Sequence, residues 1–259
     1  MDAAERWDVT LRLVQGAERA SVSELAARLG VSEMTVRRDL EALAQRGLVR
    51  RVHGGAVATR SPAGAGGFDD RAQWSAATKQ RLGAAVAALI PAGSRVLLDA
   101  GTTTVHVARA LRGPLSVTAL SLPAAMCLAE QSEIDLLVAG GRVRHGEHSL
   151  VGPLAVRALE GLAFDVFVLS IGGVHAEYGW SEFGLDDAAV KQAGLAQSAR
   201  VVAVADATKL GVRAFSRVAP LGAAHEFVTD RSASDPVIHP AGPPTLEALR
   251  DAGVLVHTI

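Results

Sequence analysis

The chain has 259 residues, of which 49% are hydrophobic, and a formal net charge of −1 at pH 7. This composition excludes a disordered chain and a protein that coats nucleic acid along its whole length. The single Cys127 excludes an internal disulfide framework, and no apolar run reaches the ~18–20 residues that span a bilayer, so we expect a cytoplasmic globular protein without a membrane partner.

Two short helices joined by a tight turn are predicted between residues 23 and 47. Ser23 is placed to cap the first helix, Gly30 to end it in a left-handed conformation, and Ser32 to cap the second helix. An amphipathic helix over residues 5–15 supplies the third helix that such a domain needs for a core. This arrangement is typical of a helix-turn-helix whose second recognition helix enters a DNA major groove.

A small β-wing follows, with two short strands around Gly54-Gly55. An adjacent arginine pair alone is more typical of a solvated helix face than of a DNA contact. Residues 28–60, however, contain seven arginines and three acidic residues, a local net charge of +4, which favours a DNA-binding surface. The candidate DNA contacts are Ser32, Thr35, Arg37 and Arg38 at or near the groove and Arg50, Arg51 and His53 on the phosphate backbone.

Residues 1–58 are therefore expected to form the DNA-binding domain. A Gly-rich linker is expected over residues 59–70, and a second domain over residues 71–259. In that domain short apolar strands alternate with helices, which indicates a Rossmann-like, mostly parallel α/β fold with ligands at the carboxyl ends of the strands. The predicted strands span 95–98, 115–119, 134–138, 166–169, 200–205 and 254–258; the predicted helices span 74–89, 105–111, 123–130, 153–162, 187–198 and 245–251.

One candidate anion site follows the first of these strands. Asp99 and Gly101 precede the hydroxyls of Thr102, Thr103 and Thr104 at the start of a predicted helix. Backbone N–H groups at a helix N-terminus favour a phosphate. Threonines at this place are equally consistent with simple helix capping, and the motif alone leaves both readings open.

Other strand ends carry similar clusters. Gly140 and Gly141 precede Arg142, whose planar guanidinium suits a phosphate or carboxylate. Gly172-Gly173 ends another strand, and residues 206–211 bring Lys209 to the same end of the sheet. Lys191 lies in the middle of a predicted helix, where a surface role is as consistent as a ligand contact. The chain has only three lysines, Lys79, Lys191 and Lys209, against 23 arginines.

Catalytic and metal motifs are not found. His145, His148 and His175 lack metal-ligand spacing, and no nucleophile elbow is present. We therefore expect no catalytic residues, no metal and no cofactor.

Taken together, these segments resemble the DeoR family of bacterial transcriptional regulators. The N-terminal matches are 31–40 (VSEMTVRRDL) and 47–56 (GLVRRVHGGA); the matches in the second domain are 99–103, 140–141, 150–152, 187–191 and 206–211. The resemblance implies an effector domain similar in fold to ribose-5-phosphate isomerases and CoA transferases. It also implies an effector that is a phosphorylated sugar or related metabolite. The candidate effector contacts are then Asp99, Gly101, Thr102, Thr103, Thr104, Gly140, Gly141, Arg142, Gly172, Gly173, Lys191 and Lys209.

The sequence departs from the family pattern at three places. Ala119-Leu120 replaces a common Thr-Asn, Gly172 replaces a polar residue, and the segment 178–180 is bulkier than usual. We expect a repressor of a carbohydrate-metabolism operon that binds double-stranded operator DNA as a homo-oligomer. Two alternatives stay open: a sugar-phosphate isomerase or transferase with a DNA-binding head, and a regulator whose second domain only oligomerises.

Overall fold

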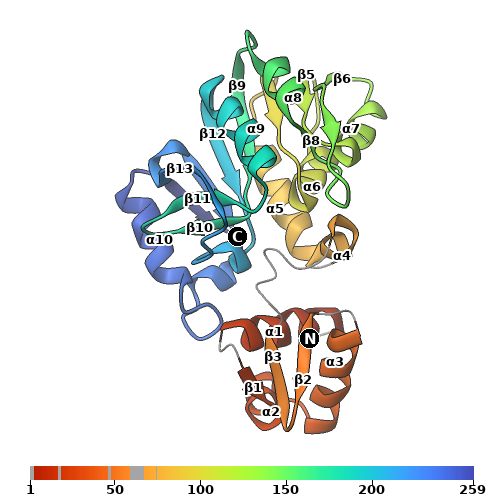
Figure 1. The fold of residues 1–259 in the computed structure, drawn as a ribbon, viewed down its shortest axis with the longest axis vertical. Coiled ribbons are helices and arrows are strands. Elements are labelled where there is room, and N and C mark those ends of the chain that lie inside the picture. The colour runs from red at the N-terminus through yellow and green to blue at the C-terminus, as the bar shows by residue number, and fades with distance from the viewer. Residues whose placement is uncertain (1–2, 17–18, 46–47, 59–66, 74) are drawn as a thin grey trace.

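The computed structural model describes residues 3–16, 19–45, 48–58, 67–73 and 75–259. They fold into a small winged helix and a larger α/β part with a parallel sheet (Figure 1). The predicted fold class is confirmed. No helix in these ranges is long and apolar enough to cross a membrane.

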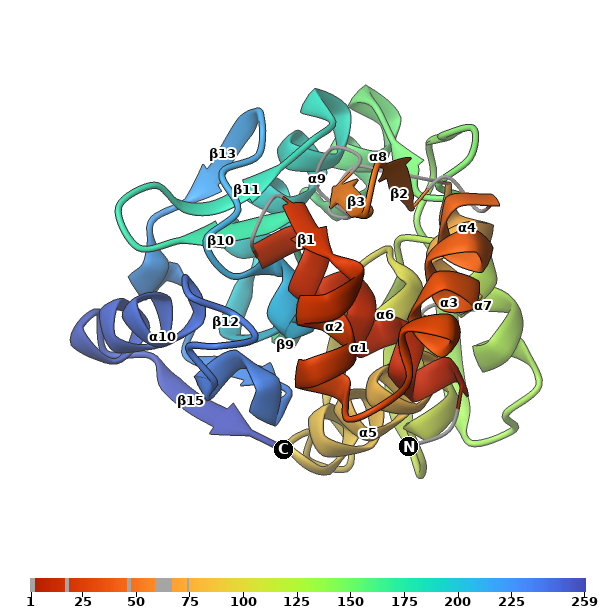
Figure 2. The same ribbon diagram turned by 90° about the horizontal axis from the view of Figure 1, so that it is seen from below.

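The winged helix has three helices and a three-stranded antiparallel sheet (Figures 1 and 2). Its core is built from the apolar stripes of the helices, including the fully buried Val36 and Leu40. The sheet order is β1-β3-β2, so the predicted two-stranded wing has a third strand. The elements are α1 (Ala3–Gly16), β1 (Arg19–Ser21), α2 (Val22–Leu29), α3 (Glu33–Gln45), β2 (Val49–Val52) and β3 (Gly55–Ala58).

One predicted helix cap is wrong. Ser21, not Ser23, caps α2: its hydroxyl accepts the Glu24 N–H at 3.2 Å, and the Glu24 carboxylate accepts the Ser21 N–H at 2.9 Å. This reciprocal pair satisfies two N–H groups, and β1 ending at Ser21 sets where the helix begins. Gly30 ends α2 at φ 65°, and Ser32 accepts the Thr35 N–H, both as predicted. The predicted end of the second helix at Gly47 lies outside the described residues.

The larger part is organised around a seven-stranded sheet in the order β15-β14-β12-β9-β4-β5-β6, in which every pairing is parallel. The predicted strands over 95–98, 115–119 and 134–138 are confirmed with the same bounds. β14 was not predicted. The strands are β4 (Arg95–Leu98), β5 (Leu115–Ala119), β6 (Ile134–Val138), β9 (Phe164–Ser170), β12 (Ser198–Val204), β14 (Glu226–Thr229) and β15 (Leu255–Thr258).

Helices cover both faces of this sheet (Figure 1). Val96 and Leu98 of β4 pack with the helices of one face, and Leu97 packs with those of the other, because successive strand residues point to opposite sides. The first face carries α5 (Ala76–Ala88), α6 (Thr102–Ala110) and α7 (Leu122–Ala129); the second carries α8 (Pro153–Leu159), α9 (Leu185–Ala196) and α10 (Gly242–Asp251).

The expected linker is shorter than predicted at its far end. Residues 59–66 lie outside the described residues, but α4 (Phe68–Gln73) already begins at Phe68. Phe68 is buried, and its ring meets the His148 ring edge-on at 5.5 Å between centroids.

The remaining elements are β7 (Arg142–Val143), β8 (Leu150–Val151), β10 (Gly173–His175), β11 (Gly179–Glu182), β13 (Ser216–Ala219), and the short 3-10 helices η1 (Ala207–Lys209), η2 (Leu221–Ala223) and η3 (Arg231–Ser234).

The strand order reverses between β4 and β9, which are neighbours in the sheet. From β4 the chain moves outward through β5 and β6, and from β9 it moves the other way through β12, β14 and β15. Loops diverge at the carboxyl ends of two such strands and leave a crevice between them. The strand order therefore predicts a ligand crevice beside Asp99 and Ser170, which follow or end these two strands.

Candidate functional site

The outward face of α3 is the first candidate site. Val36, Leu40 and Leu43 are buried against the winged-helix core, so at 100° per residue Met34 and Arg38 point directly away from it. Met34 is 59% exposed. Its thioether chain beside an exposed arginine suits contact with base edges and thymine methyl groups. Met34 was not among the DNA contacts predicted from the sequence.

Arg37 does not share the direction of Arg38. Its guanidinium pairs with Glu33 one turn earlier at 2.9 Å. Arg51 of the wing donates to the Arg37 backbone carbonyl at 3.3 Å, so this side of α3 faces the wing. Ser32 and Thr35 lie at the start of α3, with their hydroxyl oxygens 2.9 Å apart. The predicted groove contacts are therefore spread around the helix rather than along one line.

Asp39 fixes the recognition helix to α1. Its buried carboxylate accepts hydrogen bonds from Arg6 at 2.6 and 3.0 Å and from the Trp7 indole at 2.6 Å. Three charge-assisted or aromatic donors on one carboxylate hold α1 and α3 in a single orientation. Sequence spacing gave no signal for this contact, since the partners lie more than 30 positions apart.

The wing turns at His53 and Gly54, and Gly54 has a φ of 75° that favours glycine. Gly55 is also required, because a Cβ there would lie 2.1 Å from the Ala20 carbonyl oxygen of β1. Arg50 and Arg51 are both exposed but point to opposite faces of β2. His53 is exposed at the tip, so these three residues do not form one surface.

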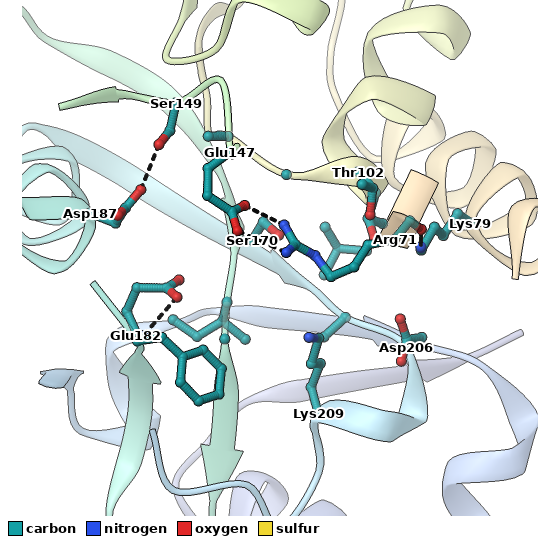
Figure 3. Close-up of a pocket in the computed structure, with 18 of the residues that line it drawn as sticks. Arg71, Lys79, Thr102, Glu147, Ser149, Ser170, Glu182, Asp187, Asp206 and Lys209 are labelled. Atoms are coloured by element: carbon teal, nitrogen blue, oxygen red, sulfur yellow. Dashed lines mark hydrogen bonds and ion pairs between the residues drawn. The ribbon is translucent and has the colours of Figure 1, made fainter. Parts of the chain in front are cut away.

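The second candidate site is a pocket at the carboxyl ends of β4, β9 and β12 (Figure 3). Loops that follow these strands form its base, and α4, α5 and the 144–149 loop contribute the other walls. Half of the twelve predicted effector residues line it: Gly101, Thr102, Thr103, Gly172, Lys191 and Lys209.

The N-terminus of α6 forms one wall. Gly101 has a φ of 141°, and a Cβ there would lie 2.8 Å from the Ser170 hydroxyl. The helix starts at Thr102 rather than at the predicted Val105, so the three threonines form its first turn. Thr104 is fully buried and donates to the Gly101 carbonyl at 2.9 Å, so its hydroxyl is used within the helix turn and does not face the pocket. Thr102 and Thr103 face the pocket, beside first-turn N–H groups that carry partial positive charge.

Asp99 and Lys191 form a buried ion pair behind this wall. The Lys191 ammonium lies 2.5 Å from the Asp99 carboxylate and donates to the Ser170 carbonyl at 3.0 Å. Asp99 also accepts the Ser170 N–H at 3.0 Å. Burial raises the pKa of Asp99 to about 6, against the opposing effect of Lys191. Burial would lower the pKa of Lys191, but the carboxylates of Asp99 and Glu182 outweigh it and raise that pKa. The pair joins β4, β9 and α9, and Asp99 itself does not line the pocket.

Lys209 is held differently. Asp206 caps η1 by accepting the Thr208 N–H at 3.0 Å, and this turn presents Lys209 to the pocket (Figure 3). Within the described part of the chain, the Lys209 ammonium makes no hydrogen bond or ion pair. Burial lowers its pKa, more than the nearby Asp206 carboxylate raises it. Burial alone would raise the pKa of Asp206, but Lys209 and Lys79 reverse this and lower it. The pocket therefore holds a half-buried cation that lacks a direct anionic partner.

Several charged residues that line the pocket were not among the predicted effector contacts. Arg71 of α4 forms a two-pronged ion pair with Glu147, and Lys79 of α5 donates to the Arg71 carbonyl. On the far side, Asp187 accepts hydrogen bonds from Arg144 at 2.5 Å and from Ser149 at 2.7 Å. The separations in sequence are 76 positions for Arg71 and Glu147, 43 for Arg144 and Asp187, and 38 for Ser149 and Asp187. Local sequence patterns cannot predict pairs this far apart.

The structure does not bring Gly140, Gly141, Arg142 and Gly173 to the pocket. The first three follow β6, the edge strand two places from β4, which is roughly 10 Å away at normal strand spacing. Arg142 is exposed there and pairs with Asp186 at 2.6 Å. Gly173 packs against Val212, whose carbonyl oxygen lies 2.5 Å from where a Cβ would be.

Two departures from the family pattern lie in the core. Leu120 is 1% exposed and is not among the residues that line this pocket. Trp180 is fully buried and donates from its indole to the Leu221 carbonyl at 2.9 Å. Gly172, by contrast, lines the pocket. Among the residues that the structure describes, no group of three or more His, Cys, Asp or Glu side chains could hold a metal ion.

Comparison with known proteins matches both parts of the chain. Residues 6–61 match the family model of a DeoR-like helix-turn-helix domain, and residues 74–231 match that of a DeoR C-terminal sensor domain. The HTH-type transcriptional regulator GlpR of Haloferax volcanii is 34% identical over 88% of this chain and 89% of its own length. The glycerol-3-phosphate regulon repressor of Haemophilus influenzae is 33% identical over 85% of this chain and 87% of its own.

Among solved structures, ribose 5-phosphate isomerase A of Methanocaldococcus jannaschii is similar over 52% of this chain and 54% of that chain, with 18% identity and a TM-score of 0.37. The two relatives above are named as a regulator and a repressor, not as enzymes. The enzyme that the sequence left as an alternative is therefore set aside.

Proposed function

We propose that this chain, which belongs to the DeoR family of DNA-binding transcriptional regulators, represses a carbohydrate-metabolism operon in the cytoplasm under the control of a phosphorylated sugar or related metabolite. The observation that carries the effector half of this proposal is Lys209, a half-buried ammonium without a direct anionic partner. An unpaired cation in a partly dry pocket is costly, and an anionic ligand would remove that cost.

The phosphate of the effector binds between Lys209 and the first turn of α6 in this proposal. Thr102 and Thr103 supply hydroxyls there, and the first-turn N–H groups supply further donors. Arg71 and Lys79 lie on the same side of the pocket (Figure 3). The relative from Haemophilus influenzae is named for the regulon of glycerol 3-phosphate, a phosphorylated polyol, which supports an effector of this class.

On DNA, α3 enters the major groove with Arg38 and Met34 toward base edges. Ser32, Thr35 and Arg37 contact the flanks of the groove, and the wing residues Arg50, Arg51 and His53 lie near phosphates. A winged helix reads one half-site, and specific operators commonly contain two. We therefore include a homo-oligomer that presents at least two winged helices to repeated half-sites.

Arg71 and Glu147 link the pocket to the DNA-binding part. Arg71 lies in α4, the first described element after residue 58, and its ion pair with Glu147 closes one side of the pocket. A phosphate at Lys209 competes with Glu147 for the Arg71 guanidinium. Loss of that pair frees α4 to shift and changes the spacing of the winged helices. Only a ligand that binds the two arrangements unequally can drive this change.

The test uses the full chain and genomic DNA. Bound fragments are recovered and sequenced, and the affinity for the recovered operator is titrated with triose, pentose and hexose phosphates. We expect one compound to change operator affinity by about 5- to 150-fold, the usual size of such coupling. A chain that selects no sequence would refute the DNA role. Selection of an operator with no response to any phosphate, and no thermal shift, would refute the effector role and leave a domain that only oligomerises.

A further inference from the structure

Gly172 leaves a space in the pocket that Glu182 fills. A Cβ on Gly172 would lie 2.6 Å from the Glu182 carboxylate oxygen Oε1 and 3.0 Å from the Phe183 ring. Gly172 follows β9, and Glu182 is the last residue of β11 in a different sheet. Because position 172 has no side chain, the carboxylate of Glu182 reaches the ligand crevice from the side.

The hydrogen bonds of Glu182 leave acceptor capacity unused. Its Oε1 accepts the Phe183 N–H at 2.8 Å, and its Oε2 lies 3.5 Å from the Lys191 ammonium. An ionised carboxylate offers about four lone-pair positions and can only accept. The side chain is 14% exposed, and that exposure faces a pocket. A ligand group that donates a hydrogen bond there would find a ready partner.

The two sides of the pocket differ in their balance of charge. Figure 3 shows Thr102, Lys79, Arg71 and the Asp206 carboxylate on one side, and Asp187 and Glu182 on the other. The Asp206 carboxylate lies near the Lys209 and Lys79 ammonium groups, which offset its charge. An anionic group placed against Glu182 would be repelled, so the phosphate of a ligand takes the first side. The remainder of the ligand then extends toward Glu182.

A neutral hydroxyl fits Glu182 better than an ammonium group does. The Lys191 ammonium already lies 3.5 Å from Glu182, and a second cation at the same carboxylate would be repelled by it. Asp187 is occupied by Arg144 and Ser149, so it offers no alternative acceptor of equal access. A hydroxyl has no charge to oppose and one proton to donate.

We propose that Glu182 is the specificity-determining residue for the hydroxyl-bearing end of the effector. The pocket then selects phosphate esters whose organic part is an uncharged polyol over esters whose organic part is apolar or cationic. This inference rests on the proposed function, because it takes the phosphate position from it. Gly172 contributes to this specificity, because any side chain at position 172 would displace the Glu182 carboxylate.

The experiment measures binding of four probes to the full chain by calorimetry: inorganic phosphate, n-propyl phosphate, sn-glycerol 3-phosphate and O-phosphoethanolamine. The wild-type chain should bind the glycerol ester at least about tenfold more tightly than the propyl ester, the effect of one hydrogen bond to a charged group. Glu182→Ala should abolish this preference and leave the affinity for inorganic phosphate unchanged or higher. Glu182→Gln, which keeps an acceptor at the same reach, should retain part of the preference.

The outcomes separate the two proposals. Binding of none of the probes would refute the phosphate site, and this inference with it. Binding of inorganic phosphate with equal affinities for the glycerol and propyl esters would overturn the inference alone. So would an unchanged preference in folded Glu182→Ala and Glu182→Gln, or tighter binding of O-phosphoethanolamine than of the glycerol ester. Thermal unfolding of each variant shows whether it is folded.

Discussion

Replacing Lys209 by methionine should weaken effector binding without weakening the fold. A charge-assisted hydrogen bond contributes about 1.5–3 kcal/mol, so the affinity for the phosphorylated effector should fall about 10- to 150-fold. The free protein should unfold at the same or a slightly higher temperature, because methionine keeps much of the volume and removes a half-buried ammonium that makes no hydrogen bond or ion pair to described residues.

The magnitude can be followed by thermal unfolding. A ligand at about 100 times its Kd stabilises the folded state by about 2.7 kcal/mol, which is roughly 5–11 °C for a domain of this size. If the variant binds about 100-fold more weakly, the same concentration gives only about 0.4 kcal/mol, or roughly 1–2 °C.

The matched control is Arg250→Ala, which removes an exposed cation from the last turn of α10, away from the pocket. Its ligand-induced shift should equal that of the wild-type chain. The reasoning fails if Lys209→Met binds the effector with wild-type affinity, or if its free form loses as much stability as its liganded form.

Three further outcomes are expected. Arg38→Ala should weaken specific operator binding by about 1–3 kcal/mol and relax base discrimination. Arg50→Ala should weaken binding to all DNA sequences alike and reduce the slope of log K against log salt concentration by about 1. Anisotropy titrations at several salt concentrations separate the two effects. Asp39→Ala should destabilise the winged helix by about 3 kcal/mol, because it removes the buried carboxylate that accepts hydrogen bonds from the Arg6 guanidinium and the Trp7 indole, and calorimetry should show an unchanged transition for the larger part. Effector affinity should fall as pH rises through the pKa of Lys209, which lies below 10.5, since only the ammonium binds the phosphate; the alkaline fall should disappear in Lys209→Arg, and its persistence there would contradict the assignment.

The sequence predicted the order of elements well because each central strand is a short apolar run bounded by turn residues. The strand-end rule placed Lys209 and Thr102 correctly at the crevice. The same rule failed to separate Gly140 and Gly141 from them, since sequence alone does not say that β6 is an edge strand two places away.

Long-range contacts account for most of what the sequence missed. Arg71 and Glu147, or Arg144 and Asp187, meet only after the sheet and its helices have packed. The short antiparallel strands, such as β10, have too few residues to show an alternating pattern. Glu182 could have been suspected only by knowing that Gly172 lies opposite it.

All three lysines of the chain line one pocket, while arginine supplies the cations elsewhere. Reagents that modify amines but spare guanidinium groups are therefore confined to this pocket and the α-amino terminus. Lys79 and Lys191 are buried, whereas Lys209 is half-exposed and has a lowered pKa, so it should be acylated first. Because acylation would remove the ammonium that binds the phosphate, the useful readout is protection: bound effector should slow the acylation of Lys209, and peptide mapping would measure this in the natural chain.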